Sequence, residues 1–265
     1  MAYTTLELTR DGQVTWLTLN RPDALNALNS TMVTELRDYF GSLPIDRDTR
    51  IVVLRGAGRA FCAGLDLKEG GGSGAPPIVQ DMLRGQRRIS ELVMMMRRAP
   101  QAIIACVHGA ACGGGFALAL AADVRIAGES ARMNAAFIRI GLSACDVGVS
   151  YFLPRLVGAS VAAELLFTGR FINAQRSLAT GLVSEVVPDA QLEDAARRLV
   201  DDMLLTSPLG LRLTKECLTA SIDAGSLDQV IAMEDRNQVL CTQTNDFREG
   251  VTAFLQKRQP HYTES

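Results

Sequence analysis

The chain has 265 residues, of which 48% are hydrophobic and 21% charged, and its formal net charge at pH 7 is -2. This length suits one or two domains with a full core, and the small net charge excludes a general attraction to nucleic acid or to a membrane surface. No apolar run reaches the roughly 18 residues of a membrane span, and the N-terminal segment MAYTTLELTRDG lacks the apolar centre of a signal peptide, so a cytoplasmic protein is expected.

Short apolar runs alternate with helical segments along the first two thirds of the chain. Residues 3–8 and 14–20 alternate as strands joined by a turn at Gly12, and Ser30 is a candidate N-cap for the helix that follows. Further strands are predicted at 50–55, 101–107, 124–127 and 184–187, and helices at 30–40, 78–98, 113–121, 150–157, 160–168 and 173–180. The segment EGGGSGAPP at 69–77 predicts a mobile loop.

The order of these elements predicts an α/β fold. From about residue 191 the pattern is helical throughout. We therefore expect a core unit at 1–190 that holds the site and a helical unit at 191–265 that serves packing or oligomerisation.

Cysteine and histidine usage argues against disulfides and against metal binding. The six cysteines include no C-x-x-C pair, and only His108 and His261 are available as imidazole ligands. The expected state of the cysteines is a set of buried, small apolar thiols.

Three consecutive glycines, Gly113 to Gly115, stand where a predicted strand gives way to a helix. Glycine lets the backbone approach a ligand closely, and the first N–H groups of a helix have no partner within the helix. The N–H of Gly114 is therefore a candidate donor to an oxyanion, although tight helix packing without a ligand explains the glycines as well. Neither a G-x-G-x-x-G fingerprint nor a P-loop is present.

A second turn of small residues, AFCAGLDL at 60–67, also follows a predicted strand. Gly64 permits an unusual dihedral angle, and the N–H of Leu65 can then point into a cleft. Asp66 is interpreted as a cap for the next turn rather than as a catalytic group. Two backbone donors that meet at one point form an oxyanion hole, which stabilises charge on a carbonyl oxygen.

Five segments together resemble the enoyl-CoA hydratase/isomerase (crotonase) superfamily over essentially the whole chain. They are NRPDALNALN at 20–29, GRAFCAGLDL at 58–67, VHGAACGGGFALALAADVRIA at 107–127, FTGRFINAQRSLATGLVSEVVP at 167–188 and DFREGVTAFLQKRQP at 246–260. The resemblance implies a spiral of ββα units, acyl-CoA thioester substrates and no cofactor apart from the coenzyme A of the substrate. It also implies C-terminal helices that form homotrimers or homohexamers.

The resemblance places the oxyanion donors at Leu65 and Gly114, in agreement with the two turns. It implies that the CoA portion runs along the segments 23–25 and 60–66. The candidate binding residues are Ala24, Ala60, Ala63, Gly64, Asp66 and Gly113. The two glutamates of typical hydratases are replaced here by Ala117 and Phe137, neither of which moves a proton.

One acid remains in the expected region. Asp146, in GLSACDVGVSYFLPRLVG at 141–158, resembles the catalytic aspartate of dienoyl-CoA isomerases and the nucleophile of 4-chlorobenzoyl-CoA dehalogenases. Dehalogenation also needs an aromatic cradle, and the single tryptophan, Trp16, lies far from the site motifs. The structural alternative is that Asp146 caps the helix beginning near Gly148. Double-bond isomerisation by Asp146 is the favoured function.

Other functions stay open at this stage. They are a non-catalytic acyl-CoA binding protein and a hydrolase or decarboxylase of a β-dicarbonyl CoA ester. A nucleophilic dyad of His108 with Cys62 or Cys112 is a weaker alternative to a hydrogen-bonded histidine at a strand end. The arginines of the 78–98 helix are interpreted as a solvated face, with CoA phosphates as the alternative partner; they are Arg84, Arg87, Arg88, Arg97 and Arg98.

Overall fold

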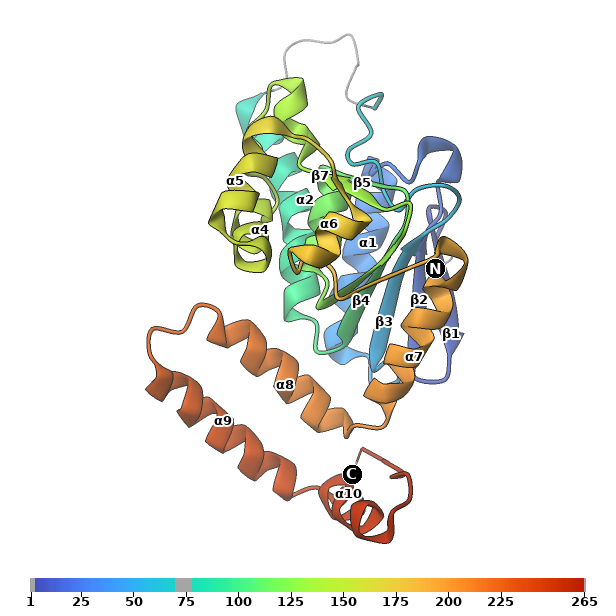
Figure 1. The fold of residues 1–265 in the computed structure, drawn as a ribbon, viewed down its shortest axis with the longest axis vertical. Helices are drawn as coiled ribbons and strands as arrows, with labels where there is room; N and C mark the ends of the chain where they lie inside the picture. Colours follow the sequence, from blue (N-terminus) through green and yellow to red (C-terminus); the bar gives the residue numbers. More distant parts are fainter. Residues whose placement is uncertain (1–2, 70–77, 265) are drawn as a thin grey trace.

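The computed structural model describes residues 3–69 and 78–264, and it has the expected α/β architecture (Figure 1). The larger sheet has six strands in the order β1-β2-β3-β4-β6-β9, in which β1 and β2 are antiparallel and the others run parallel. Its strands are β1 (Leu6–Asp11), β2 (Val14–Leu19), β3 (Ile51–Gly56), β4 (Ala102–Val107), β6 (Val124–Gly128) and β9 (Glu185–Val187).

A small second sheet has three strands in the order β5-β7-β8. They are β5 (Ala110–Cys112), β7 (Arg132–Asn134) and β8 (Ile172–Asn173). The sequence reading missed all three, because runs of two or three residues are too short to show a two-residue period.

Helices cover both faces of the larger sheet. They are α1 (Ser30–Ser42), α2 (Val79–Arg98), α3 (Gly114–Ala121), α4 (Val149–Val157), α5 (Ala159–Thr168), α6 (Ala174–Ala179), α7 (Leu192–Leu204), α8 (Pro208–Ser221), α9 (Leu227–Thr242) and α10 (Asn245–Gln256). The six helices predicted up to residue 180 are confirmed to within a few residues at each end. The predicted cap of α1 is wrong by one position, because the side chain of Asn29, not Ser30, accepts the N–H of Met32 at 2.9 Å. Of the predicted loop, residues 70–77 lie outside the described residues.

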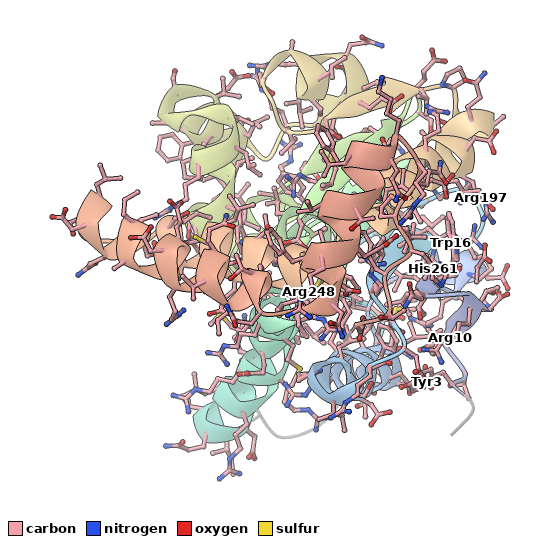
Figure 2. The ribbon with its side chains drawn as sticks, turned by 90° about the horizontal axis from the view of Figure 1, so that it is seen from below. Tyr3, Arg10, Trp16, Arg197, Arg248 and His261 are labelled. Atoms are coloured by element: carbon pink, nitrogen blue, oxygen red, sulfur yellow. The ribbon has the colours of Figure 1, made fainter. Side chains whose placement is uncertain are left out.

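The continuous apolar runs of the central strands supply two separate cores. Successive side chains of β3 point to opposite faces, so that Val52 and Leu54 join the core beneath α1 to α5, whereas Ile51 and Val53 join the core beneath α7. Trp16 belongs to the α7 core, where the Arg197 guanidinium lies 4.7 Å from its ring centroid (Figure 2).

The C-terminal helices differ in how they meet the body. Helix α7 packs on β4 and β6, while α8, α9 and α10 extend beyond the sheet (Figure 1). Lys215 of α8 is buried, and its ammonium group lies 2.8 Å from the Asp123 carboxylate and donates to the carbonyls of Met96 and Gln101. This ion pair fastens α8 to the body. None of the helices within the described residues is both long and apolar enough to cross a lipid bilayer.

Candidate active site

Two segments distant in sequence lie side by side at the carboxyl ends of β3 and β4. Cys62 and Ala111 form a parallel bridge, in which the Cys112 N–H donates to the Cys62 carbonyl at 2.9 Å. Gly64 lies so close to the next turn that a Cβ atom there would be 3.6 Å from the Gly114 nitrogen. The structure thus brings together the two turns that the sequence singled out.

The N–H groups of Leu65 and Gly114 have no hydrogen-bond acceptor in the described part of the chain. A parallel bridge pairs Leu28 with Leu65, but its two hydrogen bonds use the neighbouring Gly64 carbonyl and the Asp66 N–H. Gly113 donates to the Asn134 carbonyl, and Gly114 then opens α3. Within the described residues, neither the Leu65 nor the Gly114 amide donates a hydrogen bond to a protein atom. Both are therefore available to an external oxygen.

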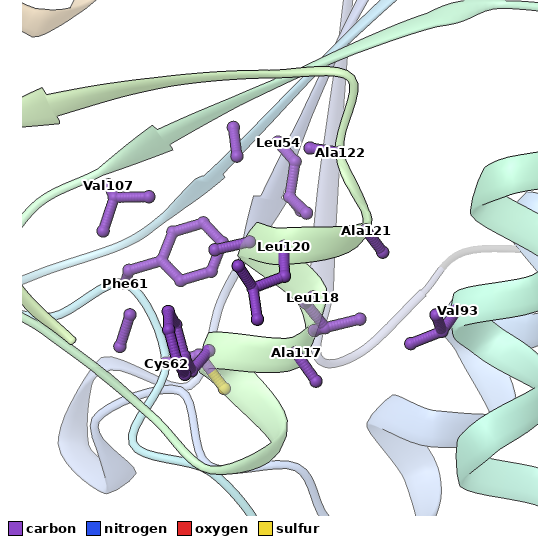
Figure 3. Packing of buried hydrophobic residues seen from close by; sticks show 14 of the residues in the cluster. Leu54, Phe61, Cys62, Val93, Val107, Ala117, Leu118, Leu120, Ala121 and Ala122 are labelled. Atoms are coloured by element: carbon purple, nitrogen blue, oxygen red, sulfur yellow. The ribbon is translucent and has the colours of Figure 1, made fainter. Parts of the chain in front are cut away.

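Helix α3 strengthens the electrostatic effect of the Gly114 amide. Its N-terminus carries a partial positive charge, and all of its residues are buried. Figure 3 shows this small-residue helix packed against Phe61 and Cys62 of the other turn. A Cβ at Gly115 would meet the Cys62 carbonyl at 2.3 Å, so the two turns approach as closely as they do only because glycine stands there. In such a low-dielectric setting a hydrogen bond to a developing negative charge is stronger than in water.

The two positions that resemblance assigns to hydratase glutamates lie beside these amides. Ala117 is on α3 and is 1% exposed. Phe137 is 4% exposed, and its ring edge would lie 3.4 Å from a Cβ at Gly113. Both positions are apolar and closely packed, so neither supplies an acid or a base.

Asp146 lies on the loop between Gly141 and α4, half-buried and bound to α2. Its Oδ1 accepts a hydrogen bond from the Gln86 side chain at 2.5 Å and another from the Val147 N–H at 2.8 Å. The expectation that Asp146 alternatively caps α4 is wrong, because the N-cap of α4 is Gly148 and no side chain bonds to that cap. The carboxylate therefore has no role in ending or starting a helix.

Hydrogen bonds join the two segments expected along the CoA path, around Ala24 and from Ala60 to Asp66. Ala24 ends a short 3-10 helix, and Ala63 donates its N–H to the Leu25 carbonyl at 2.9 Å. Ala60 is buried, and its carbonyl accepts the side-chain amide of Asn26 at 2.8 Å. Sequence reasoning missed Asn26, a fully buried residue with a positive φ that ties the two segments together.

Asp66 has a structural partner. Its carboxylate pairs with Arg21 at 2.9 Å and accepts the N–H of Lys68, in keeping with the expected capping of the following turn. The Arg21 hydrogen bond holds the pKa of Asp66 below its ordinary value, so this carboxylate stays ionised.

A cleft of about 1100 Å³ reaches Leu65 from the surface. It lies between the first turns of α1, the segment 65–69 and the middle of α2, where Gly85, Arg88 and Ile89 line it. This volume is ample for an acyl chain. Neither Gly114 nor Asp146 lines the cleft.

The competing chemistries find no support among these residues. His108 Nε2 is 2.9 Å from the Gly58 carbonyl, which confirms the histidine as a hydrogen-bonded strand-end residue. Burial raises the pKa of Cys62 to about 12 and raises that of Cys112 as well, so neither thiol is a ready nucleophile. Within residues 3–69 and 78–264, no three His, Cys, Asp or Glu side chains are grouped so as to hold a metal ion.

The arginines of α2 mostly have protein partners. Arg84 pairs with Asp81, Arg98 with Glu91 and Arg97 with Asp123. The guanidinium group of Arg88 donates to the hydroxyl of Thr34 at the edge of the cleft.

Comparison with known proteins gives consistent matches over the whole chain. A sequence profile described as enoyl-CoA hydratase/isomerase matches residues 9–265. A probable enoyl-CoA hydratase of Mycobacterium bovis is 38% identical over 259 residues, which cover 95% of this chain and 90% of that protein. The 1,2-epoxyphenylacetyl-CoA isomerase of Escherichia coli is 35% identical over 93% of this chain and 94% of its own length. The crystal structure of a putative enoyl-CoA hydratase from Streptomyces coelicolor superposes with a TM-score of 0.94 and 35% identity, covering 100% of this chain and 96% of that one.

Proposed function

Because the chain belongs to the enoyl-CoA hydratase/isomerase family and is an enzyme acting on acyl-CoA, we propose that it shifts a double bond in an acyl-CoA thioester. In this proposal the amides of Leu65 and Gly114 hold the thioester oxygen, and the Asp146 carboxylate moves the proton. The observation that carries the proposal is a pair of amides on two adjoining turns, neither of which donates to any residue that the structure describes.

The reaction proceeds in two proton transfers. Asp146 takes a proton from the carbon α or γ to the thioester, and the electron pair of that C–H bond moves into the acyl group and places negative charge on the thioester oxygen. The same carboxyl group then returns the proton to the other carbon, and the oxygen loses its charge. Water is not consumed, and the only cofactor moiety is the coenzyme A that the substrate carries.

The oxyanion hole acts on the intermediate more than on the substrate. The enolate oxygen bears much more negative charge than the oxygen of the ground-state thioester, so the two donors stabilise the intermediate preferentially. One well-placed donor contributes about 3–4 kcal/mol to such a step.

Isomerisation is favoured over hydration because neither of the two positions that resemblance assigns to the hydratase glutamates carries a carboxylate. Addition of water needs a base for the water and an acid for the carbon. The apolar Ala117 and Phe137 supply neither, whereas a proton shuttle needs only Asp146. The apolar residues at positions 117 and 137 also favour a second candidate function, in which the protein binds acyl-CoA without converting it.

The test is a turnover assay on purified protein with 2-enoyl-, 3-enoyl- and dienoyl-CoA esters, with products separated by chromatography, weighed by mass spectrometry and their double bonds placed by NMR. We expect products that are isomers of the substrate and have not gained a water molecule. We also expect Asp146→Asn to abolish turnover while CoA-ester binding is retained. Unchanged turnover in Asp146→Asn removes this residue from the mechanism. Binding without conversion of any ester supports the non-catalytic alternative, and loss of CO₂ or of free coenzyme A from a β-dicarbonyl ester supports a decarboxylase or a hydrolase.

The proposed assembly is a homotrimer or a homohexamer built through α8 to α10. These helices leave large apolar side chains exposed, and Phe254 of α10 is 83% exposed. Apolar surface of this kind is typical of a protein interface.

A further inference from the structure

The carboxylate of Asp146 is held on one oxygen only. Oδ1 accepts hydrogen bonds from the Gln86 side chain and the Val147 N–H, at 2.5 Å and 2.8 Å. Across the described residues Oδ2 has no hydrogen-bond partner. A carboxylate with one oxygen fixed and one free is oriented and still able to accept a proton.

The backbone beside Asp146 is strained. Val147 has a φ of 40° although it is β-branched, and Gly148 follows with a φ of 85°. A β-branched residue in this region is an outlier, and such outliers concentrate at active sites. The Asp146 carbonyl accepts the Val149 N–H at 2.9 Å, which closes the turn. Within the described residues, the hydrogen bond from Gln86 of α2 is the one that reaches the carboxylate from another helix or strand.

We propose that Gln86 is a positioning residue for Asp146, which holds Oδ1 through its side-chain N–H and so leaves Oδ2 free to take the proton. The inference rests on the proposed function, in which Asp146 is the acid and base. It assigns Gln86 no contact with substrate.

The place of Gln86 on α2 strengthens this inference. The adjoining residue Gly85 and, one turn further, Ile89 line the cleft that leads to Leu65. The same short stretch of α2 therefore contacts both the cleft and the carboxylate.

Two substitutions separate positioning from simple packing. Gln86→Met keeps the length of the side chain and removes the N–H donor. Gln86→Glu keeps the shape almost exactly but replaces the donor by an acceptor that faces the Asp146 carboxylate. A packing role predicts that the Glu variant behaves like the wild type, whereas a positioning role predicts that it is the worse of the two. Gln80→Met is the matched control, because Gln80 is exposed on the same helix.

The measurements are kcat and KM on the CoA ester that the wild-type protein isomerises, together with exchange of its α and γ protons in D₂O by NMR. We expect Gln86→Met to lower kcat about tenfold, the equivalent of about 1.4 kcal/mol, with KM within about twofold. We expect a larger fall in Gln86→Glu, none in Gln80→Met, and no further fall in either turnover or exchange when Gln86→Met is added to Asp146→Asn.

The outcomes for Gln86 and for Asp146 are distinguishable. If Asp146→Asn is inactive while Gln86→Met and Gln86→Glu both keep wild-type kcat, the positioning role is refuted and the proposed function stands. If Asp146→Asn turns over normally, or if the wild-type protein exchanges no α or γ proton of any ester, the proposed function fails and this inference fails with it.

Discussion

Gly64→Ala is the substitution that tests the oxyanion hole without touching its donors. Gly64 has a φ of 98°, and a Cβ there would lie 2.8 Å from the Cys112 carbonyl oxygen, a backbone atom that cannot rotate away. Restoring an ordinary contact of 3.4 Å requires about 0.6 Å of movement between the two turns. Because Leu65 is the next residue, its N–H moves away from Gly114 as the turns separate.

The expected effect is large on kcat and small on binding. Misalignment of one donor removes about 3 kcal/mol of stabilisation from the enolate, which corresponds to about a hundredfold loss of kcat. KM for the CoA ester is expected to stay within about threefold, since the ground-state thioester oxygen carries less charge than the enolate oxygen and gains less from the donor. The strained φ and the close contact together lower the free energy of unfolding by about 1–3 kcal/mol.

The control is Gly12→Ala. Gly12 also has a positive φ, 57°, but a Cβ there meets nothing within 4 Å, so the substitution carries the dihedral strain without the clash. We expect it to destabilise by about 1–2 kcal/mol in urea unfolding and to leave kcat unchanged. The reasoning is refuted if Gly64→Ala, assayed by product formation on the same ester, keeps the kcat of Gly12→Ala.

Three further predictions concern stability and assembly. Lys215→Met is expected to lower the free energy of unfolding by about 3 kcal/mol in urea, because it leaves the Asp123 carboxylate and two carbonyls without their ammonium partner; a loss below about 0.5 kcal/mol would contradict this. Hydrogen bonds from Arg176 lower the pKa of Glu164 from 4.5 to about 2, so this pair stabilises the fold above pH 4.5 and the effect disappears as the pH falls towards 2. The stability difference between wild type and Glu164→Gln should therefore shrink over that interval, and a difference independent of pH would show that the pair is not its source. Phe254→Asp should reduce the molar mass measured by light scattering to that of smaller assemblies, and an unchanged mass would exclude this side chain from the interface.

The sequence predicted the parts of the fold in which a periodic pattern is long enough to be seen. The central strand β3 appeared as a β-branched run, because both of its faces are buried. The short strands β5, β7 and β8 carry no such signal, since they exist only where tertiary contacts align two or three residues. The cap of α1 was misplaced because Asn29 and Ser30 are both good capping residues and only the backbone geometry decides between them.

The candidate site was predictable where backbone chemistry dictates residue type. Glycine-rich turns after two strands indicated Leu65 and Gly114, because only glycine permits the positive φ of Gly64 and the contact of Gly115 with Cys62. Asn26 and Gln86 were not predictable, since each forms a hydrogen bond with a partner more than 30 residues away in the sequence. Polar residues of these types are ordinary on any surface, so position in the fold alone distinguishes them.

The most direct test of the oxyanion hole is a crystal structure of this protein with a bound acyl-CoA ester. The account predicts that the thioester oxygen lies about 2.7–3.1 Å from both the Leu65 and the Gly114 nitrogen. A thioester oxygen that contacts neither nitrogen, in a site fully occupied by the ester, would contradict it.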